Sequence, residues 1–237
     1  MTHPDIPLKE ATAVALTQEK VVRSAVDLLA RAGLEALTLR RLATELGVSA
    51  PTLYWHVRNK RQLLDLMAEA LVARAGRSTS PAHGQPWWDW LAEQARLQWR
   101  VLTSHRDAAL VVAGNRPTEA ALPDVEEIVA SLVVVGFPPA EALRTILSIG
   151  NYVIGCAVEF QAEAAREPDP EPDARFLREL HGSGDLPNLQ AAMPGVAGSD
   201  PGVGFEHGLG LLIAGIRARH AELLDATGAV GAPAEPG

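Results

Sequence analysis

The chain has 237 residues, of which 47% are apolar and 21% charged, and a formal net charge of −8, as expected of a globular protein with a substantial core. No uncharged apolar stretch reaches the roughly 18 residues of a membrane span, and the N-terminus lacks a secretory signal pattern, so we expect neither a membrane span nor secretion. Cys156 is the only cysteine, which excludes an intramolecular disulfide and favours a cytoplasmic location.

The charge is unevenly distributed along the chain. Residues 1–75 carry ten Lys or Arg against eight Asp or Glu, a net charge of +2, so the remainder carries −10. A basic module on an acidic body fits contact with nucleic-acid phosphates at one end of the molecule. The alternative is that so small an excess has no function, and charge alone does not separate the two.

The first elements begin after a segment without periodicity. Residues 1–16 are expected to form a disordered N-terminal extension. Thr17 can cap a helix that runs to Gly33, along which apolar residues recur at three- and four-residue spacing. These apolar residues are Val21, Val22, Ala25, Leu28, Leu29 and Ala32.

Residues 38–60 carry the most specific pattern in the chain, two short helices joined by a tight turn. Gly47 can end the first helix, and Ser49 can cap the second, which has Pro51 in its first turn. This pattern is typical of a helix-turn-helix, which places its second helix in the major groove of DNA. The alternative is a small helical hairpin with a polar exposed face.

The second helix of this unit is too polar and aromatic to be core. If Leu53 and Val57 share the buried face, Tyr54 and Trp55 cannot both be buried with them. The residues left facing outward are Thr52, Tyr54 and His56. Hydroxyls and an imidazole suit phosphate oxygens and base edges, which favours DNA contact over a merely solvated face.

A capping-box-like pair, Asn59 and Gln62, predicts a fourth helix that runs to about Gly76. The Ser-, Pro- and Gly-rich segment that follows is the natural domain boundary. We therefore predict a DNA-binding domain over residues 17–76 and a second domain over residues 77–226.

The second domain is also helical in pattern and shows no strand-like alternation, which predicts an all-α fold. The expected helices cover about 86–104, 118–135, 139–164 and 202–226, with a weaker one near 186–193. Residues 165–185 are acidic, rich in proline and glycine, and expected to form a loop. Residues 227–237 are expected to be a disordered tail.

Two glutamines interrupt the apolar stripe of the 86–104 helix. The stripe consists of Trp87, Trp90, Leu91, Leu97, Val101 and Leu102. Because a buried amide without a partner costs several kcal/mol, roughly, Gln94 and Gln98 indicate a polar-lined pocket. The alternative is that both amides hydrogen-bond another helix.

The 202–226 helix is apolar nearly all round, which is typical of a helix buried on both sides. One side consists of Phe205, Leu209, Leu212, Ile213, Ile216 and Leu223, and the other of Gly208, Leu211, Ala214, Gly215 and Ala218. This pattern favours a subunit interface, with the 139–164 helix as partner, since its Gly150 and Gly155 permit close approach. The alternative is an internal core helix.

The run LTLRRLATELGVSAPTLYWHVRNKRQLLDLMA resembles the DNA-binding domain of the TetR family of transcriptional regulators. The similarity continues in LTSHRD (102–107), GNRPTE (114–119), GFPPAEAL (136–143) and GCAVE (155–159). The resemblance implies a homodimeric repressor in which the fourth helix joins the helix-turn-helix domain to a larger domain that binds a small effector and dimerises.

The resemblance also implies roles for residues at the DNA. Arg40 would contact a guanine, and Lys60 would reach the phosphate backbone. The second helix would contact phosphates or bases through Ala50, Pro51, Thr52, Tyr54, Trp55 and His56. Ala50 stands where tetracycline-binding members have a base-reading glutamine, and Leu39 replaces a threonine. A methyl group makes only apolar contacts with a base, so we expect a different operator sequence.

The effector site implied by the resemblance includes Gln94 and Gln98. The other expected residues are Val112, Arg116, Pro117, Asn151 and Glu159. Tetracycline-binding members hold a magnesium–tetracycline chelate with histidines and a glutamate, and Gly76, Val112 and Asn151 replace the histidines. We therefore expect an organic effector with no required metal or cofactor. Trp87, Trp90 and Trp99 favour a flat, partly polar aromatic molecule of the natural-product kind.

Three functions remain open. The first is a ligand-gated repressor that leaves a palindromic operator when an effector reshapes the 106–117 segment and swings the fourth helix. The second is a DNA-binding regulator of the same fold without a small-molecule effector. The third is an enzyme that uses Ser104, His105 and Asp107, although no nucleophile elbow or oxyanion loop accompanies these residues.

Overall fold

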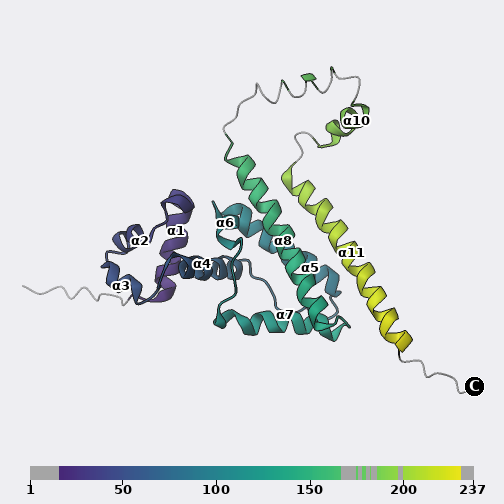
Figure 1. Ribbon diagram of the computed structural model, residues 1–237, viewed down its shortest axis with the longest axis horizontal. Helices are drawn as coiled ribbons and strands as arrows, with labels where there is room; N and C mark the ends of the chain where they lie inside the picture. The colour runs from purple at the N-terminus through teal and green to yellow at the C-terminus, as the bar shows by residue number, and fades with distance from the viewer. Residues whose placement is uncertain are drawn as a thin grey trace, which may run out of the picture.

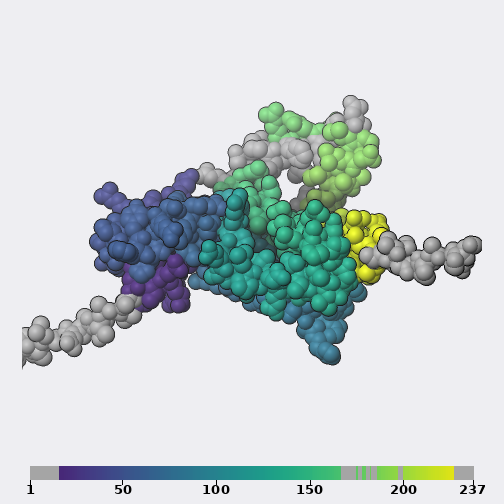
Figure 2. All heavy atoms as spheres, turned by 60° about the horizontal axis from the view of Figure 1, so that its bottom comes forward, coloured from purple at the N-terminus to yellow at the C-terminus, as the bar shows by residue number. Residues whose placement is uncertain are grey.

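The computed structural model describes residues 16–166, 186–196 and 200–230, together with Arg175, Arg178, Glu179 and Gly182. Within these residues every regular element is a helix, which confirms the predicted all-α fold (Figure 1). The helix-turn-helix domain, in purple to blue, projects as a lobe from one end of the helical body (Figure 2). None of the described helices combines the length and the apolar character needed to cross a membrane.

The first helices begin where local chemistry predicts, but the first of them continues beyond its expected end. α1 (Gln18–Ala36) starts at Thr17, whose Oγ1 accepts a hydrogen bond from the backbone N–H of Lys20 over 3.2 Å. The expected end at Gly33 is a kink, because Gly33 has a φ of 79° and the helix resumes after it. α2 (Leu39–Glu45) starts at Thr38 and is followed by Gly47, which has a φ of 66°.

The recognition helix α3 (Ala50–Tyr54) is short and starts at Ser49, whose Oγ accepts a hydrogen bond from Thr52 N over 3.3 Å. α4 (Lys60–Arg74) starts at Asn59, whose Oδ1 accepts from Gln62 N over 2.9 Å. The reciprocal bond differs from an ideal capping box, because Gln62 Oε1 accepts from Arg58 N rather than from Asn59 N. Both helix starts are therefore secured by side chains.

One apolar cluster holds α1 to α4 together. It consists of Val21, Leu28, Leu29, Leu42, Leu53, Val57, Leu63 and Met67, all fully buried. Burying each such side chain contributes about 1.5–3 kcal/mol, which suffices to fix helices as short as α3. α4 also packs against α5 and α6, so one helix joins the two halves of the molecule.

The helical body is built around two long helices. α5 (Trp87–Ser104) packs against α8 (Pro139–Ala164), and α7 (Leu122–Val134) packs across α8. These three elements match the predicted helices, although α7 is preceded by the 3₁₀ turn η1 (Glu119–Ala121). The sequence did not predict α6 (Ala108–Val112), because its five residues are too few to show a helical period.

The C-terminal half contains α10 (Pro187–Val196), where the sequence predicts a weak helix, and α11 (Pro201–Val230), which lies along α8 (Figure 1). α11 extends beyond the expected end at residue 226. The expected extension at 1–16, the loop at 165–185 and the tail at 227–237 fall wholly or mostly outside the described residues, and residues 227–230 of that tail belong to α11.

α8 and α11 approach each other closely at Gly208. A Cβ on Gly208 would collide with the hydroxyl of Tyr152, which donates a hydrogen bond to the Phe205 carbonyl over 2.8 Å. Leu143 of α8 and Leu211 of α11 remain exposed, Leu211 by 64%. α11 therefore packs inward on one side and presents apolar side chains on the other.

Candidate DNA-binding surface and ligand cavity

The outer face of α3 presents two aromatic rings to solvent. Leu53 and Val57 are buried, whereas Tyr54 is 52% exposed and Trp55 is 89% exposed. Exposure of a tryptophan to this extent is unusual for a side chain that contributes so much free energy when buried. The other expected contact residues of α3 and its ends, Ala50, Pro51 and Thr52, are exposed, and His56 is half-buried.

The same face carries positive charge. Arg40 is exposed on α2, and Lys60 is exposed at the start of α4, where its Nζ makes a long 3.5 Å hydrogen bond to the Leu34 carbonyl. Glu45, the one acidic residue between positions 38 and 60, forms an ion pair with Arg31 and is thereby neutralised. Exposed hydroxyls, aromatic rings and cations on one helix pair are the groups that contact phosphates and base edges.

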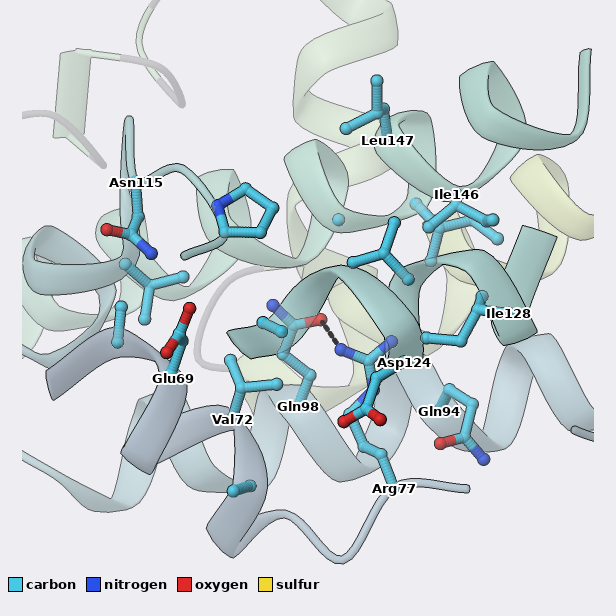
Figure 3. Close-up of a pocket in the computed structure, with 18 of the residues that line it drawn as sticks. Glu69, Val72, Arg77, Gln94, Gln98, Asn115, Asp124, Ile128, Ile146 and Leu147 are labelled. Carbon is cyan, nitrogen blue, oxygen red and sulfur yellow. Dashed lines mark hydrogen bonds between the residues drawn. The ribbon is translucent and has the colours of Figure 1, made fainter. Parts of the chain in front are cut away.

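A cavity of about 600 Å³ lies where α4, α5, α7 and α8 meet (Figure 3). Its walls also include the segment after α4, the end of α6 and the loop that leads to η1. The lining is mainly apolar, for example Val72, Ile128 and Ile146, with a few polar side chains among them. Its size and mixed lining are those of a site for a drug-sized organic molecule.

Gln94 and Gln98 line this cavity and are 5% and 7% exposed. Gln94 is held by the segment after α4: its Oε1 accepts from Ser78 N over 3.0 Å, and its Nε2 donates to Ser78 Oγ over 3.2 Å. Trp90 Nε1 donates to the same Ser78 Oγ over 2.9 Å. Both sequence interpretations thus hold in part, because Gln94 lines a cavity and is also hydrogen-bonded, but to the interdomain segment rather than to another helix.

The other expected effector residues divide into two groups. Val112, Pro117 and Asn151 line the cavity, whereas Arg116 is exposed beside it and is not part of its wall. Glu159 lines a second cavity between α5, α8 and α11, which shares Asn151 with the first. The sequence could not assign residues of α8 to one cavity or the other. The assignment depends on which turns of α8 face each cavity, and this is set by helix packing.

The three tryptophans do not act together. Trp90 lines the cavity, but Trp87 packs edge-on against Phe137, with ring centroids 5.1 Å apart. Trp99 stacks on Phe205 at 4.5 Å, with an angle of 9° between the rings. Of the three, only Trp90 therefore lines the cavity, because the other two rings are used in packing α5 against other helices.

The sequence analysis missed several polar residues of the cavity wall, among them Glu69, Arg77 and Asn115. Glu69 accepts hydrogen bonds from the backbone N–H and the hydroxyl of Thr118 over 2.6 and 3.0 Å. Arg77 and Asn115 each contribute a buried atom without a hydrogen-bond partner, Nε and Oδ1 respectively. Burial lowers the pKa of the Arg77 guanidinium. No periodicity marks Arg77 and Asn115, since both lie in loops.

The donor set of the cavity does not fit a magnesium chelate held by imidazoles. No histidine lines it, and its two carboxylates are Glu69 and Asp124. Across the part of the chain that the structure describes, no three His, Cys, Asp or Glu side chains gather in a way that could hold a metal ion.

Three contacts join the DNA-binding helices to the cavity wall. Arg61 of α4 donates to the carbonyl of Gly114, and Glu69 of α4 binds Thr118 as described above. Asp107, at the start of α6, accepts from the backbone N–H of Leu34 near the end of α1. The loop before η1 is thus tied to α4 at two points.

The Ser104, His105 and Asp107 side chains do not assemble as a catalytic triad. His105 Nδ1 lies 2.9 Å from the Val101 carbonyl and 3.0 Å from Ser104 Oγ, so it interacts within its own helix end. The Asp107 carboxylate is engaged by Leu34 N instead of His105.

These two sites and the helix that joins them define a helix-turn-helix regulator with a ligand cavity. Residues 21–67 match the family description "Bacterial regulatory proteins, tetR family", and residues 80–220 match "Tetracyclin repressor-like, C-terminal domain". The chain belongs to the TetR family: it is a transcriptional repressor with a helix-turn-helix domain and a ligand-binding C-terminal domain.

Three similar proteins illustrate this membership. The tetracycline repressor protein class C of Escherichia coli is 35% identical over 201 residues, which cover 85% of this chain and 90% of that protein. A second relative is a single-substitution variant of TetR from Acinetobacter baumannii AYE, solved in complex with minocycline. It is 32% identical, with a TM-score of 0.69, and the match covers 87% of this chain and 99% of that chain. ActR from Streptomyces coelicolor, solved with (S)-DNPA, is 28% identical with a TM-score of 0.72, over 86% and 98% of the two chains.

Proposed function

We propose that this repressor binds a palindromic operator as a homodimer and is released by a small organic effector that needs no metal. The observation that carries the proposal is the 600 Å³ cavity, because one of its walls is α4, the helix that leads directly into the helix-turn-helix domain. Two structural relatives were solved with small molecules, the Acinetobacter baumannii TetR variant with minocycline and ActR with (S)-DNPA. The cavity therefore favours the ligand-gated function over a regulator without an effector.

The proposed dimer uses α8 and α11. Exposed leucines on both helices, including Leu143 and Leu211, would be removed from water by a second copy of the chain. A two-fold dimer presents two copies of α3, which would match half-sites about one helical turn apart, roughly 34 Å.

The proposed DNA contacts fall on α3 and its neighbours. Tyr54, Trp55 and Thr52 supply hydroxyl and aromatic contacts, and Arg40 and Lys60 supply charge. Ala50, Pro51 and His56 complete the surface. Because Ala50 offers only a methyl group, apolar contact with a thymine methyl is the base readout available to it.

In the proposed response, a ligand in the cavity alters the loop that Arg61 and Glu69 tie to α4. A shift of residues 113–118 would pull on α4 through these two contacts and change the separation of the recognition helices. The ligand must bind the released state better than the DNA-bound state, by roughly 1–3 kcal/mol or more. Gln94, Gln98, Val112, Pro117 and Asn151 would contact it, with Arg116 and Glu159 outside the cavity wall.

The test is selection of bound sequences from a random DNA pool, followed by a screen of aromatic natural products for release of the selected DNA. We expect a palindrome, and release that persists when EDTA is present. Release that requires magnesium would contradict the metal-free effector. If no compound of a broad panel releases the DNA, the regulator without an effector is the better description.

A further inference from the structure

Arg77 is a largely buried cation in the cavity wall that lacks a counter-ion. Its Nη1 donates to Gln98 Oε1 over 3.5 Å, the long limit of a hydrogen bond, and its Nε is buried without a partner. Figure 3 shows the guanidinium directed at Gln98 inside the cavity. Among the described residues, none of the ion pairs includes Arg77.

The carboxylates that share the cavity do not neutralise this charge. Both Glu69 oxygens are engaged by Thr118, over 2.6 and 3.0 Å. Asp124 is exposed in the first turn of α7, where the helix dipole stabilises its negative charge. A guanidinium stays protonated in proteins, so Arg77 remains charged when buried. The attraction of a nearby anion, which normally offsets the cost of burying a charge, is missing.

We propose that Arg77 recognises an acidic group on the effector, such as a carboxylate, attached to an aromatic or otherwise apolar frame. An anion placed here supplies the missing counter-ion and can accept two parallel hydrogen bonds from the guanidinium. Gln98 already orients the guanidinium from one side. This inference rests on the proposed ligand-gated function and specifies the chemistry of its ligand.

Asn115 adds a second requirement at a distance from Arg77. Its Oδ1 is buried and has no partner, and Figure 3 draws Asn115 and Arg77 in different parts of the cavity wall. An acceptor in this position favours a hydroxyl or N–H donor on the ligand. The ligand therefore carries an acidic group at one end and a donor group towards the other, separated by an apolar body that fits Val72, Ile128 and Ile146.

The probe pair for the test is 8-anilinonaphthalene-1-sulfonate and N-phenyl-1-naphthylamine, which share an aromatic frame and differ in the anionic group. Fluorescence titration of the full chain gives both affinities. We expect Arg77→Gln to weaken binding of the sulfonate about tenfold or more, because at least one charge-assisted hydrogen bond is lost. Binding of the uncharged probe should change less than twofold.

Two variants serve as controls. Arg74→Gln removes the same charge from an exposed position of α4 outside the cavity, and both affinities should stay within twofold of the parent. Ile128→Trp fills the cavity, and both probes should bind much more weakly. Unchanged binding to Ile128→Trp would place the probes elsewhere and overturn the proposal.

A second measurement needs no variant. We expect 1-naphthoate to displace N-phenyl-1-naphthylamine at a concentration at least tenfold lower than 1-naphthamide does. Equal displacement by the acid and the amide, or equal sulfonate affinity in Arg77→Gln and the parent, would overturn anion recognition. Failure of ligand gating itself would be seen separately, as operator binding that no compound reverses while the preference for acids persists.

Discussion

The carboxylate of Asp107 accepts a hydrogen bond from the backbone N–H of Leu34 over 2.7 Å, although 73 positions separate the two residues. Asp107 is the one described residue other than glycine with a positive φ, 57°. It thus combines a strained backbone at the start of α6 with a contact to the end of α1. This bond joins the DNA-binding domain directly to the cavity side of the molecule.

Asp107→Ala should therefore lower stability and loosen this junction. The change leaves Leu34 N–H without its acceptor, at a cost of about 1–3 kcal/mol in the free energy of unfolding by urea. Asp107→Asn keeps a side-chain oxygen, and asparagine tolerates the backbone conformation, so this variant should lose less stability than Asp107→Ala. Equal stability of Asp107→Ala and the parent would show that the bond does not hold the junction.

Gly33→Ala should be more damaging than the same change at Gly47. Both glycines have positive φ, so each substitution costs about 1–2 kcal/mol through the backbone. At Gly33 the new Cβ would also lie 3.0 Å from Asp107 Oδ2, whereas nothing lies within 4 Å at Gly47. Urea denaturation of the two variants measures the difference, and an equal loss would contradict the close contact.

Trp55→Ala and Tyr54→Ala should weaken operator binding by about 1–3 kcal/mol each while leaving the free energy of unfolding nearly unchanged, because both rings are exposed. Leu53→Ala is the contrasting variant, since its side chain is fully buried and its truncation should cost about 2–5 kcal/mol of stability. Operator affinity, by fluorescence anisotropy, and urea denaturation separate these effects. Parent-like affinity of both aromatic variants would remove α3 from the DNA-binding surface.

Gln94→Ala should affect the stability of the fold, whereas Gln98→Ala should affect the response to the effector. Gln94 accepts from Ser78 N, so its loss should destabilise the fold by about 1–3 kcal/mol. Gln98 makes only the long bond to Arg77, so its loss should blunt release of the operator by an effector and leave operator affinity unchanged. A normal ligand response in Gln98→Ala would exclude it from ligand contact.

The bidentate ion pair between Arg96 of α5 and Glu206 of α11 should make the docking of α11 depend on pH. Hydrogen bonding to Arg96 lowers the pKa of the Glu206 carboxyl. Its stabilisation is complete above the unfolded-state pKa of about 4.3 and is lost as the pH falls through the lower folded-state pKa. Because both side chains are substantially exposed, the effect should stay below about 1 kcal/mol.

This pH dependence is measured as the free energy of unfolding at pH 7 and at pH 3. Arg96→Gln should be less stable than the parent at pH 7 and should show a smaller loss on acidification. If Arg96→Gln and the parent lose the same stability between the two pH values, the pair does not contribute.

The sequence alone determined the longer helices and most of their starts, because a helical period and an N-terminal cap depend on near neighbours. Thr17, Ser49 and Asn59 each cap a helix through a backbone N–H three residues ahead, which composition and spacing reveal directly. The buried positions of Gln94 and Gln98 likewise follow from the period of a single helix. The exposed ring of Tyr54 follows from the same reasoning, whereas the greater exposure of Trp55 and the half-burial of His56 do not.

Tertiary structure decided which distant residues share a site. It brought Arg77 and Ser78 from an apparent linker into the cavity wall, separated Glu159 from that cavity, and used Trp87 and Trp99 for packing. It also joined Asp107 to Leu34. Such contacts depend on how helices pack against one another, and a loop residue carries no period that would reveal its partner, so only the assembled fold shows where an unpaired charge lies.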